Sequence, residues 1–356
     1  MTLPKEEFTI EDTFQSNITT MNISTLQTLK NSSQTANVLK KTIPCLTSKS
    51  HKGSSGRISV LGGSEKYTGA PFYASMSALR TGADLATVYC ALEASLPIKT
   101  YSPELMVESV YEANVMNQYA SQEGKTVQNH VHVQEMIEKV LSSIDRTHAL
   151  IIGPGLGRDA NVMMATAEII KEAKRKGISM VLDADALFLI SLQEYRDVIA
   201  ELVSPSPSGS VVVLTPNVVE YNRLVENIAG GSMDSLKQAL PGIVMIQKGA
   251  NDIIEYFPRR NEQGKMMICK EEGGLKRSGG IGDILAGCIG TFVAWNQILS
   301  NNDEETDIVM SCFLATAITK RATALAFEKR KRAMTAPDVL EEIGFAVDDI
   351  AGSTIE

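Results

Sequence analysis

One segment of the sequence combines accessible backbone with a single carboxylate. It reads RSGGIGDILAG, residues 277–287, where glycine fills three of the four positions before Asp283 and an apolar run follows. Such glycines leave N–H groups bare at the start of a helix, where the dipole favours a phosphate or a phosphoryl group in transfer. A carboxylate there can take the proton of an attacking hydroxyl. The alternative, an aspartate that only stabilises the first helical turn, explains Asp283 but not the glycines.

A second glycine-rich segment, GPGLG at residues 153–157, follows an apolar run and precedes a predicted helix. Its N–H groups suit an anionic ligand, but a tight turn with positive φ angles explains the glycines equally well. The spacing does not match the GxGxxG fingerprint of dinucleotide-binding domains, and the chain has no GxxxxGK[ST] phosphate loop. An ordinary P-loop enzyme is therefore excluded.

Three further segments place polar side chains where a predicted strand ends. Asp183 and Asp185 in VLDADAL could hold Mg²⁺, although we expect Asp185 to cap the following helix and leave Asp183 open. Asn217 and Glu220 in TPNVVE have the spacing of a helix capping box. Lys248 in QKGAND could meet a phosphate as a point charge, and a solvated surface lysine is an equal alternative.

These segments belong to an alternation of short apolar runs and helical patterns. Continuous β-branched runs are typical of parallel strands buried on both faces, and the strand–helix repetition predicts an open, mostly parallel sheet with helices on both sides. The predicted parallel strands are residues 57–63, 85–91, 149–155, 179–185, 210–216 and 242–249, and residues 251–257 and 265–272 predict an antiparallel hairpin at the sheet edge. The predicted helices are residues 70–83, 133–144, 159–177, 284–299, 307–327 and 337–343. Because ligands bind beyond the carboxyl ends of such strands, the polar segments should meet on one rim.

The composition narrows the classes of protein. The 356 residues are 44% hydrophobic and 21% charged, as in an ordinary globular protein. A net charge of -8 argues against nucleic acid as a partner. The five cysteines are scattered without a CxxC pair, which argues against structural zinc and favours a reducing compartment. The longest apolar stretch, residues 284–299, falls below the ~18 residues of a membrane span, so we expect no membrane partner.

The first fifty residues differ from the rest. Residues 1–10 carry two glutamates and no apolar core, which does not fit a signal peptide. Residues 21–41 are rich in serine, threonine and asparagine, with three lysines and no acid, which favours a flexible polar tail over an organelle presequence. We therefore predict a tail over residues 1–50, a single catalytic domain over residues 51–356 and a cytoplasmic protein, with a mitochondrial form as the alternative.

At RSGGIGD the sequence resembles the ribokinase-like superfamily, whose GxGD motif carries a catalytic aspartate and an anion hole. The matching residues are Gly280, Gly282 and Asp283. One branch, the ATP- or ADP-dependent NAD(P)H-hydrate dehydratases, shares with this chain an ordered series of segments over about residues 51–345: HKGSSGRISVLGGS, YTGAPFYAS, ALRTGADLATV, PELM, GPGLGRD, LDADAL, LTPNVVE, QKGAND and GGLKRSGGIGD. The chain departs from many members at Asn217, where they carry histidine, and at Ser278, where they carry threonine.

The resemblance implies a three-layer α/β/α ribokinase-like fold and a metabolite-repair reaction. ATP with Mg²⁺ would phosphorylate the hydroxyl of the hydrated nicotinamide ring in the S epimer, and elimination of phosphate would restore NADH or NADPH. An NAD(P)H-hydrate epimerase would be a functional partner, and a homo-oligomer stays open. The alternative enzyme is a kinase of the same fold for a thiazole, pyrimidine or sugar alcohol, and a non-catalytic nucleotide-binding protein is a third reading.

The resemblance also implies the roles of individual residues. Asp283 would be the catalytic base and would touch the hydrate. The hydrate would further contact Gly155, Gly157, Asn217, Val218, Val219, Glu220, Tyr221, Asn222 and Arg223. ATP would be bound by Lys248, Gly249, Ala250, Asn251, Asp252, Gly273, Gly274, Leu275, Lys276, Arg277, Ser278, Gly279, Gly280, Ile281 and Gly282. The magnesium ion would arrive with the nucleotide, and its protein ligands are not assigned.

Overall fold

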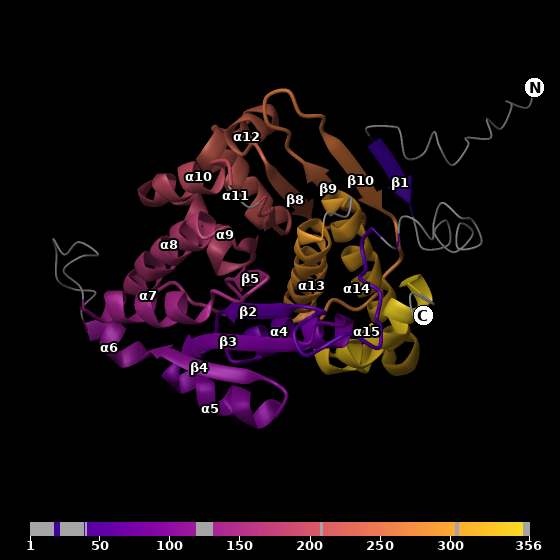
Figure 1. Ribbon diagram of the computed structural model, residues 1–356, viewed down its shortest axis with the longest axis horizontal. Helices are drawn as coiled ribbons and strands as arrows, with labels where there is room; N and C mark the ends of the chain where they lie inside the picture. Colours follow the sequence, from indigo (N-terminus) through magenta and orange to yellow (C-terminus); the bar gives the residue numbers. More distant parts are fainter. Residues whose placement is uncertain are drawn as a thin grey trace, which may run out of the picture.

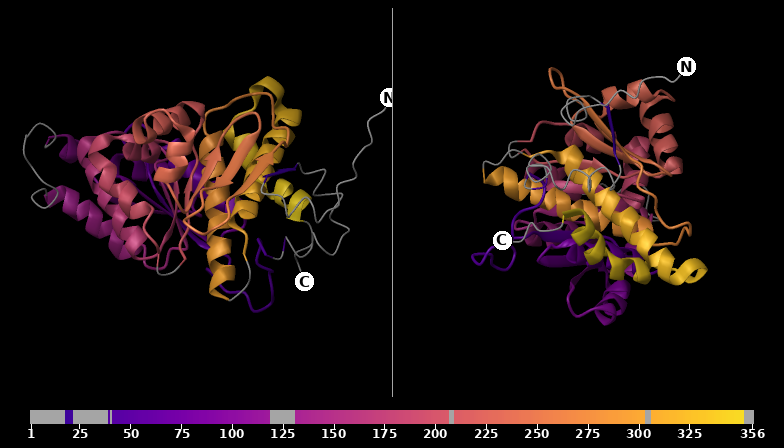
Figure 2. Two further views of the ribbon diagram at one scale, coloured as in Figure 1. Left: turned by 90° about the horizontal axis from the view of Figure 1, so that it is seen from above. Right: turned by 90° about the vertical axis from the view of Figure 1, so that its right-hand side faces the viewer.

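The computed structural model describes residues 18–21, 39, 41–118, 131–206, 209–302 and 306–351. These residues form a ten-stranded sheet in the order β1-β10-β9-β8-β7-β6-β5-β2-β3-β4, with helices on both faces (Figures 1 and 2). The strands are β1 Ile18–Met21, β2 Arg57–Leu61, β3 Leu85–Ala91, β4 Met106–Tyr111, β5 Ala149–Ile152, β6 Ser179–Leu182, β7 Val212–Leu214, β8 Ile243–Gln247, β9 Asp252–Tyr256 and β10 Lys265–Cys269. The predicted α/β/α layering is confirmed.

Helices α4, α13, α14 and α15 pack against one another on one side of the sheet, and α7, α8 and α10 form a layer on the other. The helices are α4 Gly69–Thr81, α5 Leu92–Tyr101, α6 Ala113–Gln118, α7 Val131–Ser143, α8 Ala160–Arg175, α9 Asp185–Ser191, α10 Arg196–Leu202, α11 Val218–Ala229, α12 Met233–Ala239, α13 Ile281–Asn301, α14 Ile308–Arg330 and α15 Ala336–Ala351, with 3₁₀ turns at Gln193–Tyr195 and Lys331–Ala333. Each helix layer covers one face of the strands, so the central strands are buried on both sides.

The order of the strands reverses at one place. The chain runs from β2 outward through β3 to β4 and then returns to the other side of β2 as β5, from which β6, β7 and β8 continue in parallel. Among the described strands the pairs β8/β9 and β9/β10 alone are antiparallel, and the second of them is the predicted hairpin. The point between β2 and β5 is therefore a topological switch point, where the two following loops diverge and leave a crevice.

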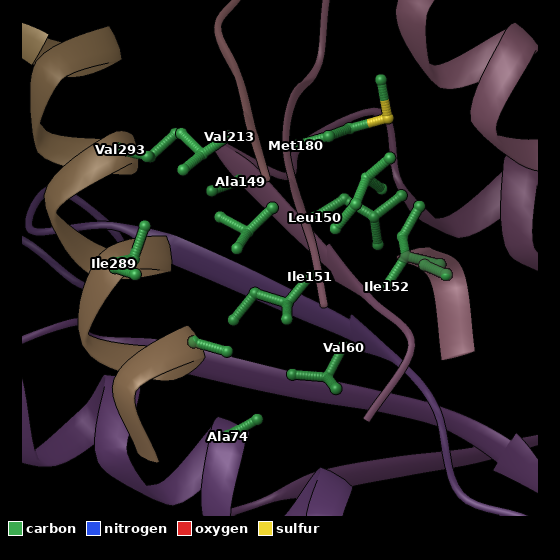
Figure 3. Packing of buried hydrophobic residues seen from close by; sticks show 14 of the residues in the cluster. Val60, Ala74, Ala149, Leu150, Ile151, Ile152, Met180, Val213, Ile289 and Val293 are labelled. Atoms are coloured by element: carbon green, nitrogen blue, oxygen red, sulfur yellow. The ribbon is translucent and has the colours of Figure 1, made fainter. Parts of the chain in front are cut away.

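The core lies where α13 crosses the middle of the sheet. All four residues of β5 are fully buried, as the continuous apolar run predicts. Figure 3 shows Ile289 and Val293 of α13 directed at the sheet, and Ile151 lies so close to this helix that a Cβ atom on Gly290 would be 2.7 Å from its Cδ1. Each fully buried side chain of this size stabilises the fold by about 1.5–3 kcal/mol.

Helices α13 and α14 are each long and apolar enough to cross a membrane, judged by length and composition alone. In both, 72% of the most apolar stretch is buried inside the protein, so packing in the core accounts for their composition. The predicted run of residues 284–299 is shorter than the helix because α13 begins three residues earlier, at Ile281. All five cysteines are free thiols.

Strand β1 lies within residues 1–50, where the sequence predicts only a polar tail. Its residues Ile18–Met21 pair in parallel with Met266–Cys269 of β10, so one more strand lies outside the hairpin. The sequence ITTM is too short and too polar to signal a strand by periodicity. The boundary of the domain at residue 50 stays a prediction, although residues 18–21 contribute to the sheet.

Candidate active site

Three polar side chains meet where β6, β7 and β8 end. Asp183 follows β6, Thr215 follows β7 and Lys248 follows β8. The Lys248 Nζ donates to Asp183 Oδ1 at 2.7 Å, and the Thr215 hydroxyl donates to the same oxygen at 2.7 Å. Asp183 is only 2% exposed, so its charge depends on these donors. The structure thus decides against a solvated surface lysine, because the ammonium group of Lys248 is held in an ion pair with a buried carboxylate.

The charge of Lys248 is secured by this arrangement. Burial acts to lower the pKa of Lys248. The negative charge of Asp183, and those of Glu220 and Asp283, raise it by more, so the pKa of Lys248 lies above its ordinary value. The ammonium group therefore stays protonated at neutral pH. A fixed positive charge at the end of a strand is suited to an anionic group on the ligand.

Asp283 lies in the first turn of α13, partly exposed, beside this cluster. Burial and then the negative charge of Asp183 raise the pKa of Asp283 to about 7, while Lys248 opposes the shift. A carboxylate with such a pKa can both accept and release a proton near neutral pH. The geometry thus separates two adjacent carboxylates: Asp183 stays paired with a lysine, and Asp283 is left to titrate.

The segment around the start of α13 contains glycines of two kinds. Gly280 is the N-cap of α13 with φ 92°, and a Cβ atom there would lie 2.8 Å from both the Tyr73 ring and the Ala336 side chain. A Cβ atom on Gly279 would meet no described atom within 4 Å, and one on Gly282 would meet the Lys248 ammonium group at 3.7 Å. Packing therefore requires glycine at Gly280, whereas Gly279 and Gly282 leave open space for a ligand beside the helix N-terminus.

Most residues predicted to bind ATP line one cavity of about 170 Å³. From the predicted set they are Lys248, Gly249, Ala250, Asp252, Gly273, Gly274, Lys276, Arg277, Ser278, Ile281 and Gly282. The remaining members, Asn251, Leu275, Gly279 and Gly280, are not part of its lining. The two loops that the sequence indicates separately are thus brought together around one space between β8, β9 and the start of α13.

Helix α14 contributes a wall of this cavity that is not evident from the sequence. Thr316, Thr319, Lys320 and Thr323 of that helix line it, together with Leu285 of α13. Lys320 donates to the carbonyl of Ala250 at 2.5 Å and pairs with Asp252 at 3.4 Å, which fixes the turn between β8 and β9. The one available signal is the recurrence of threonine and lysine in an otherwise apolar helix, and that pattern alone indicates no function.

The residues predicted to bind the hydrate divide between two elements. Asn217 caps α11 and Glu220 completes the predicted capping box, with the Asn217 Oδ1 2.9 Å from the Val219 amide. Val219 and Asn222 are exposed at the rim, whereas Tyr221 is buried in the hydrophobic core. Burial raises the pKa of Glu220, and Lys248 and Asp183 are its charged neighbours, so the start of α11 borders the ion pair.

Gly155 and Gly157 lie in the other wall of the rim, after β5. Both have positive φ, 62° and 83°, as has Gly153 at 119°, so the turn interpretation of this loop is supported on geometry. The expectation that Asp185 caps α9 is wrong. Its carboxylate accepts from the Gly157 amide at 2.9 Å and from Arg158 Nε at 3.0 Å, while the N-cap position is held by Ala184 without a side-chain bond.

No group of three or more histidine, cysteine, aspartate or glutamate side chains is arranged for a metal ion in the part of the chain that the structure describes. The Oδ1 atom of Asp183 is already occupied by Lys248 and Thr215. A magnesium ion held mainly by nucleotide phosphates and water suits this donor set, since Mg²⁺ keeps several waters and takes few protein ligands.

Comparison with known proteins finds a family match and relatives that share one name. Residues 58–344 match the family NAD(P)H-hydrate dehydratase. The protein named ATP-dependent (S)-NAD(P)H-hydrate dehydratase from Neurospora crassa is 35% identical over 342 residues, which cover 88% of this chain and 92% of that protein. Its namesake from Homo sapiens is 36% identical over 334 residues, which cover 89% of this chain and 85% of that protein.

Solved structures show the same fold. A ribokinase-like superfamily protein from Enterococcus faecalis aligns with a TM-score of 0.65 and 18% identity, covering 94% of this chain and 97% of that one. The ADP/ATP-dependent NAD(P)H-hydrate dehydratase from Bacillus subtilis, co-crystallised with ATP and Mg²⁺, aligns with a TM-score of 0.56 and 21% identity, covering 88% and 97%. These likenesses confirm the ribokinase-like architecture.

Proposed function

The chain belongs to the NAD(P)H-hydrate dehydratase family, and from that premise we propose that it uses ATP to dehydrate the S epimer of hydrated NADH and NADPH. The product would be the intact reduced dinucleotide, so the enzyme would be a lyase that repairs a damaged metabolite. The observation that supports this most is Asp283, which lies in the first turn of α13 beside a buried Asp183–Lys248 pair and has its pKa raised to about 7.

The reaction needs a base and a site for phosphoryl charge. The hydroxyl oxygen of the hydrated ring attacks the γ-phosphorus of ATP, its proton passes to Asp283, and ADP leaves. The ring C–O bond then breaks, phosphate departs with the electron pair, and the neighbouring ring carbon loses a proton to water to restore the double bond. Lys248 and the open backbone at Gly279 and Gly282 would stabilise the charge on the phosphoryl oxygens.

We assign the magnesium ion to the nucleotide, where it would neutralise charge on the transferring phosphate. The cavity lined by Lys248, Gly274, Ser278 and Lys320 would hold ATP, and the loops at Gly155 and Asn217 would hold the hydrate. We place Asp283 between the ATP cavity and the hydrate-binding loops. Lys248 and Lys320 are the cations best suited to the phosphates, because each is anchored by a carboxylate and neither needs to be ordered on binding.

The decisive experiment is incubation of the purified protein with NADH hydrate, ATP and Mg²⁺. We expect recovery of the reduced-nicotinamide absorbance together with release of inorganic phosphate. A small-molecule kinase of the same fold would instead consume ATP on another alcohol and leave a stable phosphorylated product. Absence of recovered absorbance at saturating ATP would overturn the proposal.

We also propose a cytoplasmic location and a functional pairing with an enzyme that interconverts the R and S hydrates, because a dehydratase specific for one epimer leaves the other untouched. Fractionation with an antibody against the chain would test the location. A mixture of both epimers would test the pairing: we expect about half of the hydrate to be repaired by this protein alone when the mixture is equal and the remainder only after an epimerase is added. Complete repair without epimerase contradicts the pairing.

A further inference from the structure

A large cleft lies at the switch point of the sheet. Its volume is about 750 Å³, and it lies between the loop after β2, which supplies Ser64 and Tyr67, and the loop after β5, which supplies Gly155 and Arg158. The two loops are tied together, because the Ser64 hydroxyl donates to the Gly155 carbonyl at 2.9 Å. This hydrogen bond fixes the two walls of the crevice relative to each other, and the crevice is wide enough for a nucleotide.

The cleft is adjacent to the catalytic region through Asp185. This carboxylate lines the cleft and binds Gly157 and Arg158, and it lies two residues after Asp183, the carboxylate that pairs with Lys248 in the catalytic region. A ligand with one end at Asp283 can thus continue into the cleft past Arg158. A hydrated nicotinamide dinucleotide has this extended form, with a diphosphate between its two nucleosides.

The guanidinium group of Arg158, which lines the cleft, and that of Arg223 both lie near one aromatic ring. Arg158 lies 3.9 Å from the centroid of Phe188, and Arg223 of α11 lies 5.3 Å from it. Phe188 is partly buried in α9, so the ring is a fixed platform. Arg223 belongs to the predicted hydrate-binding segment 217–223, and Arg158 follows the predicted Gly157. These two residues, far apart in the sequence, therefore converge on Phe188, a side chain that no sequence motif singles out.

Both guanidinium groups have donors to offer. Arg158 is exposed and bonds Asp185 through Nε, and its terminal nitrogens meet no acceptor among the residues that the structure describes. Arg223 makes no ion pair within the same described part of the chain and is half-buried. Stacking on a ring leaves the edge of a guanidinium group open, and that edge matches two phosphate oxygens.

We propose that Arg158 and Arg223 bind the diphosphate of the dinucleotide substrate and that the switch-point cleft takes its adenosine half. This inference rests on the proposed function. It assigns specificity for a dinucleotide over a mononucleotide to two residues that act away from the reacting ring. It also explains why Arg158 is aligned on Phe188 by Asp185, since an oriented guanidinium group loses less entropy on binding.

The test compares two substrates across matched variants. The substrates are NADH hydrate and the hydrate of reduced nicotinamide mononucleotide, which lacks the adenosine half and the diphosphate. The variants are Arg158→Ala, Arg223→Ala, Arg158→Lys and the control Arg175→Ala, whose guanidinium group pairs with Glu201 on the surface of α8. Unfolding midpoints of all variants are measured alongside the kinetics.

We expect the wild-type protein to prefer NADH hydrate, and each alanine variant at Arg158 or Arg223 to raise KM for NADH hydrate roughly tenfold or more with kcat little changed. KM for the mononucleotide hydrate should change much less, so the preference shrinks. Arg158→Lys should recover part of the loss, because it keeps the charge but not the planar fork. Arg175→Ala should behave as wild type with both substrates.

Unchanged KM for NADH hydrate in both alanine variants would refute the inference while the proposed function stands. Equal losses for both substrates, or losses that follow a lowered unfolding midpoint, would also refute it, because they show that the arginines only support the fold around Phe188. Absence of turnover of NADH hydrate by the wild-type protein would remove the proposed function and this inference with it.

Discussion

The two glycine-rich loops of the rim can be compared through the space around them. In GPGLG a Cβ atom on Gly153 would lie 1.9 Å from the Asp183 carbonyl oxygen, and φ is positive at Gly153, Gly155 and Gly157. In the segment around the start of α13, a Cβ atom on Gly279 would meet no described neighbour within 4 Å, and one on Gly282 would meet only a lysine head group. The first loop needs glycine at Gly153 to bring two backbones together. Of the three glycines in the second segment, packing requires Gly280 alone, and no described part of the protein requires glycine at Gly279 or Gly282. Glycines of the second kind indicate a ligand.

The largest effect is expected at the carboxylate that follows the open glycines. Asp283→Asn keeps the size and the helix position but removes the base, so kcat should fall by roughly 10²–10⁴-fold. Far-UV circular dichroism should match the wild type, and the unfolding midpoint should match it at low pH, where the Asp283 carboxyl is neutral in the folded and the unfolded chain. Turnover close to that of the wild type would show that another group accepts the proton.

Gly153→Ala tests the packed loop. The added methyl group must displace the Asp183 carbonyl and adopt φ 119°, which together cost roughly 3 kcal/mol of unfolding free energy. Urea unfolding followed by fluorescence would measure this, with Gly209→Ala as the control, since Gly209 also has positive φ but no described neighbour within 4 Å. An equal loss of unfolding free energy in both variants would show that the positive φ angle alone causes the effect. Close packing against the Asp183 carbonyl would then contribute nothing.

The acid limb of the pH profile should follow Asp283. With a pKa of about 7, kcat/KM should fall about tenfold per pH unit below that value, because only the ionised carboxyl accepts the proton. The free energy of unfolding changes with pH in the opposite direction. Between the ordinary aspartate pKa and pH 7, Asp283 is protonated more often in the folded protein than in the unfolded chain. The free energy of unfolding therefore falls as pH rises through that window. Asp283→Asn should therefore raise the unfolding midpoint at pH 8 relative to wild type and leave it unchanged at low pH.

Asp183→Asn should move that acid limb. Loss of the Asp183 charge removes a group that raises the pKa of Asp283 and frees Lys248, which lowers it, so the limb should shift to lower pH. We also expect kcat to fall about tenfold because the ammonium group is no longer held in place. An unshifted limb with reduced kcat would show that Asp183 supports the fold without tuning Asp283.

Gly279→Ala is the smallest change and the sharpest test of the open loop. The structure gives a methyl group free space there, so stability should change by less than ~0.5 kcal/mol. If the open backbone receives the phosphates of ATP, KM for ATP should rise several-fold while KM for the hydrate stays constant. An unchanged KM for ATP, together with an unchanged KM for the hydrate, would mean that ATP does not contact the backbone at Gly279. The difference between the two loops would then say nothing about function.

Local patterns are enough to predict the central parallel strands and the motifs that end them. Runs such as residues 149–152 are apolar without interruption because both faces are covered, and the Asn217–Glu220 capping box is written in four consecutive residues. Helix α5 escapes prediction since Pro97 interrupts its pattern. Strand β4 escapes it since the strand is half-exposed at the outer edge of the sheet and its sequence is not a continuous apolar run. The pairing of Asp183 with Lys248 spans 65 positions, so no local signal could reveal it.

Long-range contacts also explain which side chains at the rim are misassigned or missed from the sequence. Asp185 resembles a helix cap because its own neighbours suggest one, yet its partners are 27 and 28 residues away. Lys320 and Phe188 lie in helices whose patterns report burial alone, and their roles depend on which loops the sheet brings opposite them. Sequence thus identifies the residues of each loop, and only the strand order shows which loops face one another.

Strand β1 has a practical consequence for work on this protein. A chain shortened to begin at residue 51 would keep every residue proposed for catalysis but would strip the partner from Met266–Cys269 of β10. Unpaired N–H and C=O groups along an outer strand are a template for pairing with a second chain, which leads to aggregation. Solubility would then depend on a four-residue segment that has no part in the chemistry. A shortened protein should therefore retain residues 18–21, and without them we expect self-association that grows with concentration.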